Sequence, residues 1–126
     1  MSRCQAKLAI AFIAAASAVV TMSPSSAAPS TSRGLISVAQ VVQMLEQAPT
    51  DRTARQVLTA YLAGVGEAAG AVASMGRATC RTSLNLSVAD VGQALSSAAA
   101  AQAAAETPAT PLIVRDMLDR AGCKRS

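Results

Sequence analysis

The sequence predicts an all-α protein, a small bundle of about four helices with one disulfide. Apolar residues recur at helical spacing in four stretches of the chain, and no segment shows the alternation that is typical of a strand. Two cysteines, Cys80 and Cys123, follow the apolar N-terminal segment and can cross-link the helices. The length of 126 residues leaves room for one small domain.

The composition excludes several classes of function. The chain has no histidine, so histidine-based catalysis, metal ligation and pH switching are excluded. It has no tryptophan and one tyrosine, which are too few rings for a base-stacking surface. Arg3 and Lys7 supply half of the formal net charge of +4, so the remainder of the chain has no marked basic excess. We therefore expect no enzyme, no cofactor, no metal and no nucleic-acid partner.

Residues 1–27 have the features of a secretory signal peptide. Two cations precede an apolar run over residues 8–20, which only Ser17 interrupts. Small residues at positions 25 and 27 place the cleavage between Ala27 and Ala28. The alternative is a retained membrane anchor, but this run spans only about 20 Å as a helix against a hydrocarbon core of about 30 Å. We expect export to the periplasm and no permanent membrane anchor.

Cys80 and Cys123 are the two cysteines that remain after processing. In an oxidising compartment such a pair in a short chain is most simply a disulfide. A reactive thiol would need an activating base, and no histidine can provide one. The alternative is two unrelated buried thiols. Closing a loop of about 44 residues would contribute roughly 4 kcal/mol in the chain-entropy model.

The helical domain is expected over residues 37–126, after a flexible leader at 28–36 that is rich in Pro, Ser and Thr. Ser37 and Gln40 form a capping-box pattern at the start of a short helix that Pro49 ends. The residues expected on its buried face are Val38, Val41, Val42 and Leu45.

The longest helix is predicted at about 52–74, with Asp51 as its N-cap. Three glycines within it, Gly64, Gly66 and Gly70, predict either close packing against another helix or a local break. Its apolar stripe consists of Val57, Leu58, Tyr61, Leu62, Val65, Ala69 and Val72.

Residues 75–86 have no sustained period and are predicted to form a loop. Ser87 and Asp90 open a third helix, which continues into the alanine run 98–105. Alanine favours a helix but buries little area, so this end is expected to be helical and weakly anchored. The residues expected to point inward from the third helix are Val88, Val91, Leu95 and Ala98.

The last helix follows a turn at residues 107–111. Thr110 is predicted as its N-cap with Pro111 at the first helical position, and Gly122 as its end. Its buried face is expected to hold Leu112, Ile113, Met117, Leu118 and Ala121.

No acidic pair has the setting of a catalytic site. Asp116 and Asp119 lie on the last helix between Arg115 and Arg120, as on a solvated charged face. Glu67 lies inside the long apolar helix, where it is either a functional contact or a side chain that points to solvent. We leave both interpretations of Glu67 open.

The second half of the chain, over about residues 57–123, resembles the Rap/Tai family of type VI secretion immunity proteins. The family's aromatic-x-x-Gly-Val-x-acid-Ala helix is matched by Tyr61, Gly64, Val65, Glu67 and Ala68. A single mid-chain cysteine, a helix near residue 87, a Pro-containing turn and a terminal cysteine follow in the same order. One departure is Arg81, which stands where members often have proline after the mid-chain cysteine.

The resemblance implies a periplasmic protein that protects its own cell by binding a peptidoglycan amidase effector and occluding the cleft of that enzyme. It also implies pairing into homodimers. The loop 74–86 is the candidate plug, because a disulfide at Cys80 would order it before binding and lower the cost of association. Arg77 and Arg81 would be its charged contacts, the alternative being ordinary solvation of a loop.

Two other classes of function stay open. A small periplasmic chaperone or stress protein would expose its apolar stripes and suppress aggregation of clients. A subunit of an envelope complex would co-purify with membranes. An immunity protein would instead form a tight complex with one hydrolase.

Overall fold

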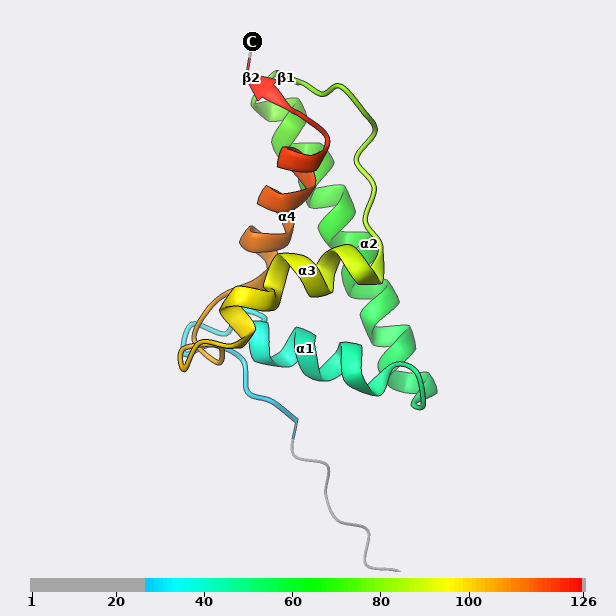
Figure 1. Ribbon diagram of the computed structural model, residues 1–126, viewed down its shortest axis with the longest axis vertical. Helices are drawn as coiled ribbons and strands as arrows, with labels where there is room; N and C mark the ends of the chain where they lie inside the picture. Colours follow the sequence, from blue (N-terminus) through cyan, green and yellow to red (C-terminus); the bar gives the residue numbers. More distant parts are fainter. Residues whose placement is uncertain (1–26, 126) are drawn as a thin grey trace, which may run out of the picture.

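A computed structural model describes residues 27–125 of the chain, and helices make up most of it (Figure 1). The helices are α1 (Val38–Gln47), α2 (Arg52–Met75), α3 (Val88–Ala99) and α4 (Ala109–Arg120). Two short strands, β1 (Ala78–Thr79) and β2 (Lys124–Arg125), pair antiparallel. The protein is a small all-α bundle with one disulfide between Cys80 and Cys123, as the sequence predicts. The predicted signal peptide lies outside the described residues except for Ala27.

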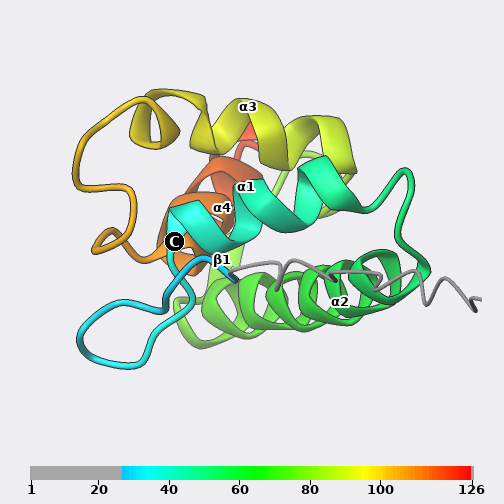
Figure 2. The same ribbon diagram turned by 90° about the horizontal axis from the view of Figure 1, so that it is seen from below.

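Each helix packs against two others. Both α1 and α4 contact α2 and α3. In Figure 1, α2 and α4 run along the long axis of the molecule while α1 and α3 lie across it. Figure 2 shows α1 between α3 and α2. The core lies where the four helices meet, and its fully or almost fully buried members are Val38, Val41, Val65, Ala69, Val91, Leu95, Ala109, Ile113 and Met117.

Three of the helix starts follow the predicted side-chain caps. The hydroxyls of Ser37 and Ser87 accept the backbone N–H of the residue three positions on, and Gln40 and Asp90 complete both capping boxes. Asp51 accepts two backbone N–H groups of the first turn of α2. These caps satisfy amides that have no partner inside a helix, which explains why α1, α2 and α3 begin at these residues.

The start of α4 differs from the prediction. The helix begins at Ala109 after Pro108, and no side chain caps it, so Thr110 is not the N-cap. The backbone N–H of Ala109 instead donates to the carbonyl of Ile36 at 3.0 Å. The leader thus supplies the acceptor that a capping side chain would otherwise provide. The Thr110 hydroxyl bonds to the hydroxyl of Tyr61 instead. The predicted end is confirmed, since α4 stops at Arg120 and Gly122 has a φ of 63°.

Several predicted core positions are exposed. Val57 and Val72 of α2 and Val88 of α3 are 52%, 44% and 55% exposed. They stand at the edges of their apolar stripes. The side of α2 that faces the bundle is buried at Ala54, Leu58, Val65, Ala69 and Ala73, and Val57 and Val72 lie beside it. The bundle therefore leaves apolar side chains on its surface.

The glycines of α2 have neither of the roles predicted for them. A Cβ placed on Gly64, Gly66 or Gly70 would have no neighbouring atom within 4 Å, apart from the backbone of the helix itself. The helix also continues without a break from Arg52 to Met75. Each of these glycines therefore has open space at its missing Cβ and does not lie at a helix crossing.

The segment expected to be a flexible leader contacts the helical body. Thr31 is 5% exposed, the Ser37 hydroxyl donates to the carbonyl of Pro29 at 2.8 Å, and the backbone N–H of Ser32 donates to Glu106 at 3.0 Å. These hydrogen bonds from the Ser32 backbone and side chain hold the pKa of Glu106 below its ordinary value. The leader therefore has defined neighbours, one of them in the segment between α3 and α4.

The alanine run is only partly helical, because α3 ends at Ala99 and turns follow. Its remainder is anchored through the backbone. The N–H of Ala39 donates to the carbonyl of Ala104 at 3.1 Å, and the N–H of Val38 to the carbonyl of Thr107 at 2.9 Å. Carbonyls in the segment that follows α3 thus accept N–H groups of the first turn of α1, which have no partner inside that helix.

Candidate functional site

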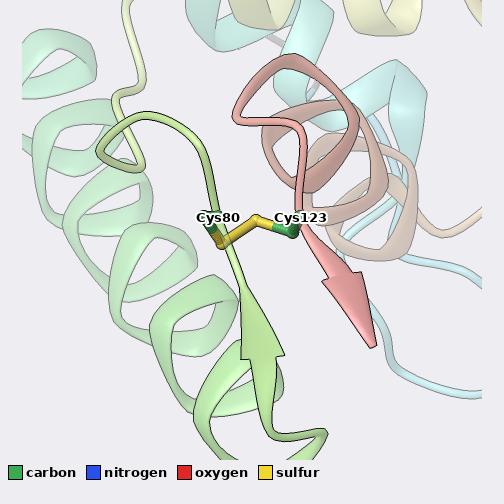
Figure 3. The surroundings of a disulfide bond; sticks show 2 residues. All are labelled: Cys80 and Cys123. Carbon is green, nitrogen blue, oxygen red and sulfur yellow. A yellow bond between two sulfur atoms is a disulfide. The ribbon is translucent and has the colours of Figure 1, made fainter. Parts of the chain in front are cut away.

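The two strands and the disulfide form one end of the molecule, and we call residues 76–87 the linked loop. Ala78 pairs with Arg125 and Thr79 with Lys124. Figure 3 shows that the bond between Cys80 and Cys123 joins the residue after β1 to the residue before β2. The chain is therefore cross-linked at the point where the two strands meet the helical body.

The disulfide is reinforced by backbone hydrogen bonds. The N–H groups of Arg81 and Thr82 both donate to the carbonyl of Ala121, at 2.9 and 3.2 Å. A Cβ on Gly122 would lie 2.9 Å from Nε of Arg81, so the Arg81 side chain packs over this glycine. Only a residue without a side chain allows both this contact and the positive φ at position 122.

The second half of the linked loop is held by Arg120. Its guanidinium donates to the carbonyl of Asn85 at 3.2 Å and to Asp116 at 2.7 Å, and lies 3.5 Å from a carboxylate oxygen of Asp90. The hydroxyl and the backbone N–H of Ser87, with a smaller effect of Arg120, hold the pKa of Asp90 below its ordinary value. One arginine therefore ties the loop to both α3 and α4.

The two arginines expected at the plug are both exposed on the linked loop. Arg77 directly follows the C-cap Gly76 of α2 and has a φ of 48°, a left-handed conformation that is uncommon outside glycine. Because α2 continues to Met75, the loop begins at Gly76, one residue after its predicted start and two after the predicted start of the plug. Arg77 and Arg81 thus flank the strand β1 on one end of the bundle.

Met75 was not singled out from the sequence, although it is the most exposed of the large apolar side chains among the described residues. It is 78% exposed and is the last residue of α2, two positions before Arg77. The pattern gave one signal that could have found it, because Met75 continues the apolar stripe by one step after Val72. An exposed methionine beside two arginines is a typical composition for a contact surface.

The residues of the family-like motif divide between the core and the surface. Val65 is 3% exposed and the half-buried Tyr61 bonds to Thr110, whereas Gly64 and Glu67 are exposed. Glu67 therefore points to solvent. It precedes Arg77 by ten residues, about 15 Å along a helix, so the motif and the linked loop form separate surfaces.

An open apolar groove of about 940 Å³ lies between the leader, α2 and α4. The charged residues that line the groove are Arg115 and Asp119. The apolar side chains of the groove are Leu35, Ile36, Val72, Val114 and Leu118. It is a second surface on which an apolar partner segment could bind.

Residues 27–125 contain no group of three or more His, Cys, Asp or Glu side chains that could hold a metal ion. Within the same range, α2 is the one helix whose length and apolar composition would allow it to cross a membrane. Length and composition alone do not assign α2 to a membrane, because core helices and signal sequences share these features.

Comparison of the chain with protein-family models, with curated proteins and with solved structures finds no match. The resemblance to the Rap/Tai proteins therefore depends on the residues quoted for it, and the function that it implies is a proposal.

Proposed function

We propose that this protein is an exported, non-catalytic binding protein of the Rap/Tai kind, which inhibits a peptidoglycan amidase by placing its linked loop in the cleft of that enzyme. One observation carries the proposal. The loop is ordered in the free chain at three places, by the disulfide, by the carbonyl of Ala121 and by Arg120. A loop that is ordered in advance loses less conformational entropy on binding.

The side chains of the linked loop, together with Met75 at the end of α2, suit this role. Met75 offers an apolar anchor, and the exposed Arg77 and Arg81 offer charged hydrogen-bond donors on either side of β1. Methionine and arginine are both enriched at protein interfaces, and arginine is one of the residue types that supply most of the binding free energy. Export to an oxidising compartment is part of the proposal, because disulfides persist there.

The test uses the oxidised chain 28–126 and Cys-His peptidoglycan amidases of the type VI effector class, beginning with any that is encoded beside this gene. The readout is the release of fragments from purified peptidoglycan. We expect stoichiometric inhibition of one amidase and rescue of cells that export that amidase to their periplasm. Undiminished hydrolysis by every amidase of the class in the presence of excess folded chain would contradict the proposal.

Charge reversal tests the surface. We expect the double variant Arg77→Glu, Arg81→Glu to weaken inhibition about tenfold or more. The matched control is Arg52→Glu, which reverses an exposed charge at the opposite end of α2. Circular dichroism and thermal unfolding check that all variants fold. Equal inhibition by the double variant and the control would place the contact elsewhere on the protein.

The apolar groove favours a second candidate, a small periplasmic chaperone. Leu35, Ile36 and Val72 line it and are 46%, 38% and 44% exposed. A chaperone would bind an apolar dye there and suppress aggregation of unfolded proteins, and Val72→Asp would abolish both effects. The related candidate, a subunit of an envelope complex, would instead keep the chain with the membrane fraction.

A further inference from the structure

The backbone nitrogen of Ala28 lies in a polar site on α1. Its N–H donates to Oε1 of Gln43 at 2.6 Å. Ala28 also borders two cavities of about 290 and 370 Å³, the first against α1 and the end of α3, the second against α1 and the start of α2. A short hydrogen bond at this nitrogen is notable because Ala28 is the residue that predicted signal cleavage would make the first of the mature chain.

A carboxylate stands beside the same site. Glu46 lies three residues after Gln43, on the same side of α1, and lines the first cavity with Ala28. Among the residues that the structure describes, no hydrogen bond or ion pair engages the Glu46 carboxylate. An acid without a partner thus lines the same cavity as the residue whose nitrogen would become cationic on processing.

We propose that hydrolysis of the Ala27–Ala28 bond creates an α-ammonium group that binds at Gln43 and Glu46, so that processing completes the folded protein. Water supplies a hydroxyl group to the Ala27 carbonyl carbon and a proton to the Ala28 nitrogen as the C–N bond breaks. The departing segment keeps a carboxylate, and the amine of Ala28 takes a further proton from solvent. In place of one N–H donor, the site then receives three donors and a positive charge.

The leader holds Ala28 in place independently of this charge. Pro29 accepts the hydroxyl of the fully buried Ser37, and Thr31 is almost completely buried. The ammonium is therefore presented to α1 rather than tethered on a free end. Figure 2 shows the start of the leader beside α1, on the side that faces α2.

The titratable groups around the site are few. Glu46 lines the first cavity and Asp51 the second, while the segments from α3 and its following turns contribute only Ala99 and Ala104. Both titratable groups are acids, so each favours the protonated form of the amine. An exposed pair of this kind shifts a pKa by about half a unit, from the ordinary α-amino range of about 7.7–8.0.

The experiment measures the α-amino pKa by NMR in a chain that begins at Ala28, released from a cleavable fusion so that it does not depend on export. We expect a value raised by about half a unit in the native chain. The shift should be lost in Glu46→Gln and kept in Glu67→Gln, a matched change of an exposed acid on α2. N-terminal sequencing of the exported protein should give Ala28.

Three results would overturn the inference. The first is an α-amino pKa in the ordinary range in the native chain, and the second is a raised pKa that survives Glu46→Gln. The third is an exported chain that begins at another residue, since the ammonium would then not lie at Gln43. None of these results depends on whether the protein binds an amidase, so they are distinguishable from a failure of the proposed function.

Discussion

The hydroxyl of Tyr61 lies 3.0 Å from the hydroxyl of Thr110, and this hydrogen bond joins the middle of α2 to the first turn of α4. The two residues are 49 positions apart in the chain. Tyr61 is half-buried, and its ring packs against the core. The bond therefore gives the aromatic residue of the family-like motif a structural role, which is to fix the position of α4 on α2.

The Tyr61 phenol should ionise above its ordinary pKa of 10.0. Burial raises the pKa of Tyr61, and the hydrogen bond with Thr110 offsets part of this effect. In the unfolded chain the phenol loses its proton near pH 10, while the folded chain keeps it to a higher pH. The contribution of the protonated Tyr61 phenol to the free energy of unfolding is therefore complete below about pH 10. It is lost as the pH rises through the pKa of the folded chain.

Ultraviolet titration can follow this ionisation directly, because Tyr61 is the only tyrosine in the chain and tryptophan is absent. We expect a midpoint above 10 in the native chain and near 10 in urea. In Tyr61→Phe, the steeper loss of stability above pH 10 should disappear. Native and unfolded titrations that coincide would show that the phenol is not shielded from water.

Local signals account for the part of the fold that the sequence predicted. Ser37 with Gln40, Asp51, and Ser87 with Asp90 each cap a helix within three residues, so neighbouring positions were sufficient to find these starts. The last helix is different, because its first amide bonds to Ile36 and its Thr110 bonds to Tyr61. Such partners are distant in the chain, and a local pattern cannot reveal them.

The sequence also does not predict how wide the buried face of each helix is. Helical spacing shows which residues share a side of a helix, but not how much of that side its neighbours cover. Val57, Val72 and Val88 are exposed for this reason. At the candidate site, the sequence identifies Arg77 and Arg81 as the charged residues of the predicted loop, but it places Met75 in that loop although Met75 ends α2.

Two serine caps should differ in their effect on stability. Ser37 is fully buried, accepts the N–H of Gln40 and donates to the carbonyl of Pro29. Ser37→Ala should therefore cost about 1–2 kcal/mol in urea unfolding, since it removes a cap and leaves a carbonyl without its donor. Ser87→Ala removes an exposed cap and should cost less, because water can replace the lost bond. Equal losses would show that burial of Ser37 adds nothing to its cap.

Gly64 and Gly122 should respond in opposite ways to alanine. Gly64 lies in a helix with no atom near its missing Cβ, so Gly64→Ala should stabilise the protein by about 0.5–1 kcal/mol. Gly122 has a positive φ, and its Cβ would lie 2.9 Å from Nε of Arg81. Gly122→Ala should therefore destabilise the protein by more than about 1 kcal/mol in the same thermal or urea measurement.

The variant Gly64→Ala also tests whether the exposed surface of α2 around this residue contacts an amidase. If Gly64→Ala stabilises the chain yet weakens inhibition of an amidase, then the open face at Gly64 is part of the contact. Unchanged inhibition would exclude the surface around Gly64 from the contact. A loss of stability in Gly64→Ala would contradict the open space that surrounds this residue.

The disulfide should be the largest single contribution to stability among these predictions. Cys80 and Cys123 are 43 positions apart, and a cross-link over such a loop contributes about 4 kcal/mol by restricting the unfolded chain. The double variant Cys80→Ser, Cys123→Ser should lose about this much in urea unfolding. Thiol titration of the oxidised chain 28–126 should find no free thiol, either in native buffer or in denaturant.

The linked loop should lose its order together with the disulfide, because Arg81 and Thr82 bond to the carbonyl of Ala121 only while the two segments stay together. Hydrogen exchange of these two amides should therefore become much faster in the double variant. Amides in the middle of α2, such as that of Val65, serve as the internal control. Exchange that rises equally at Val65 would show that the cross-link supports the whole bundle and has no particular effect on the loop.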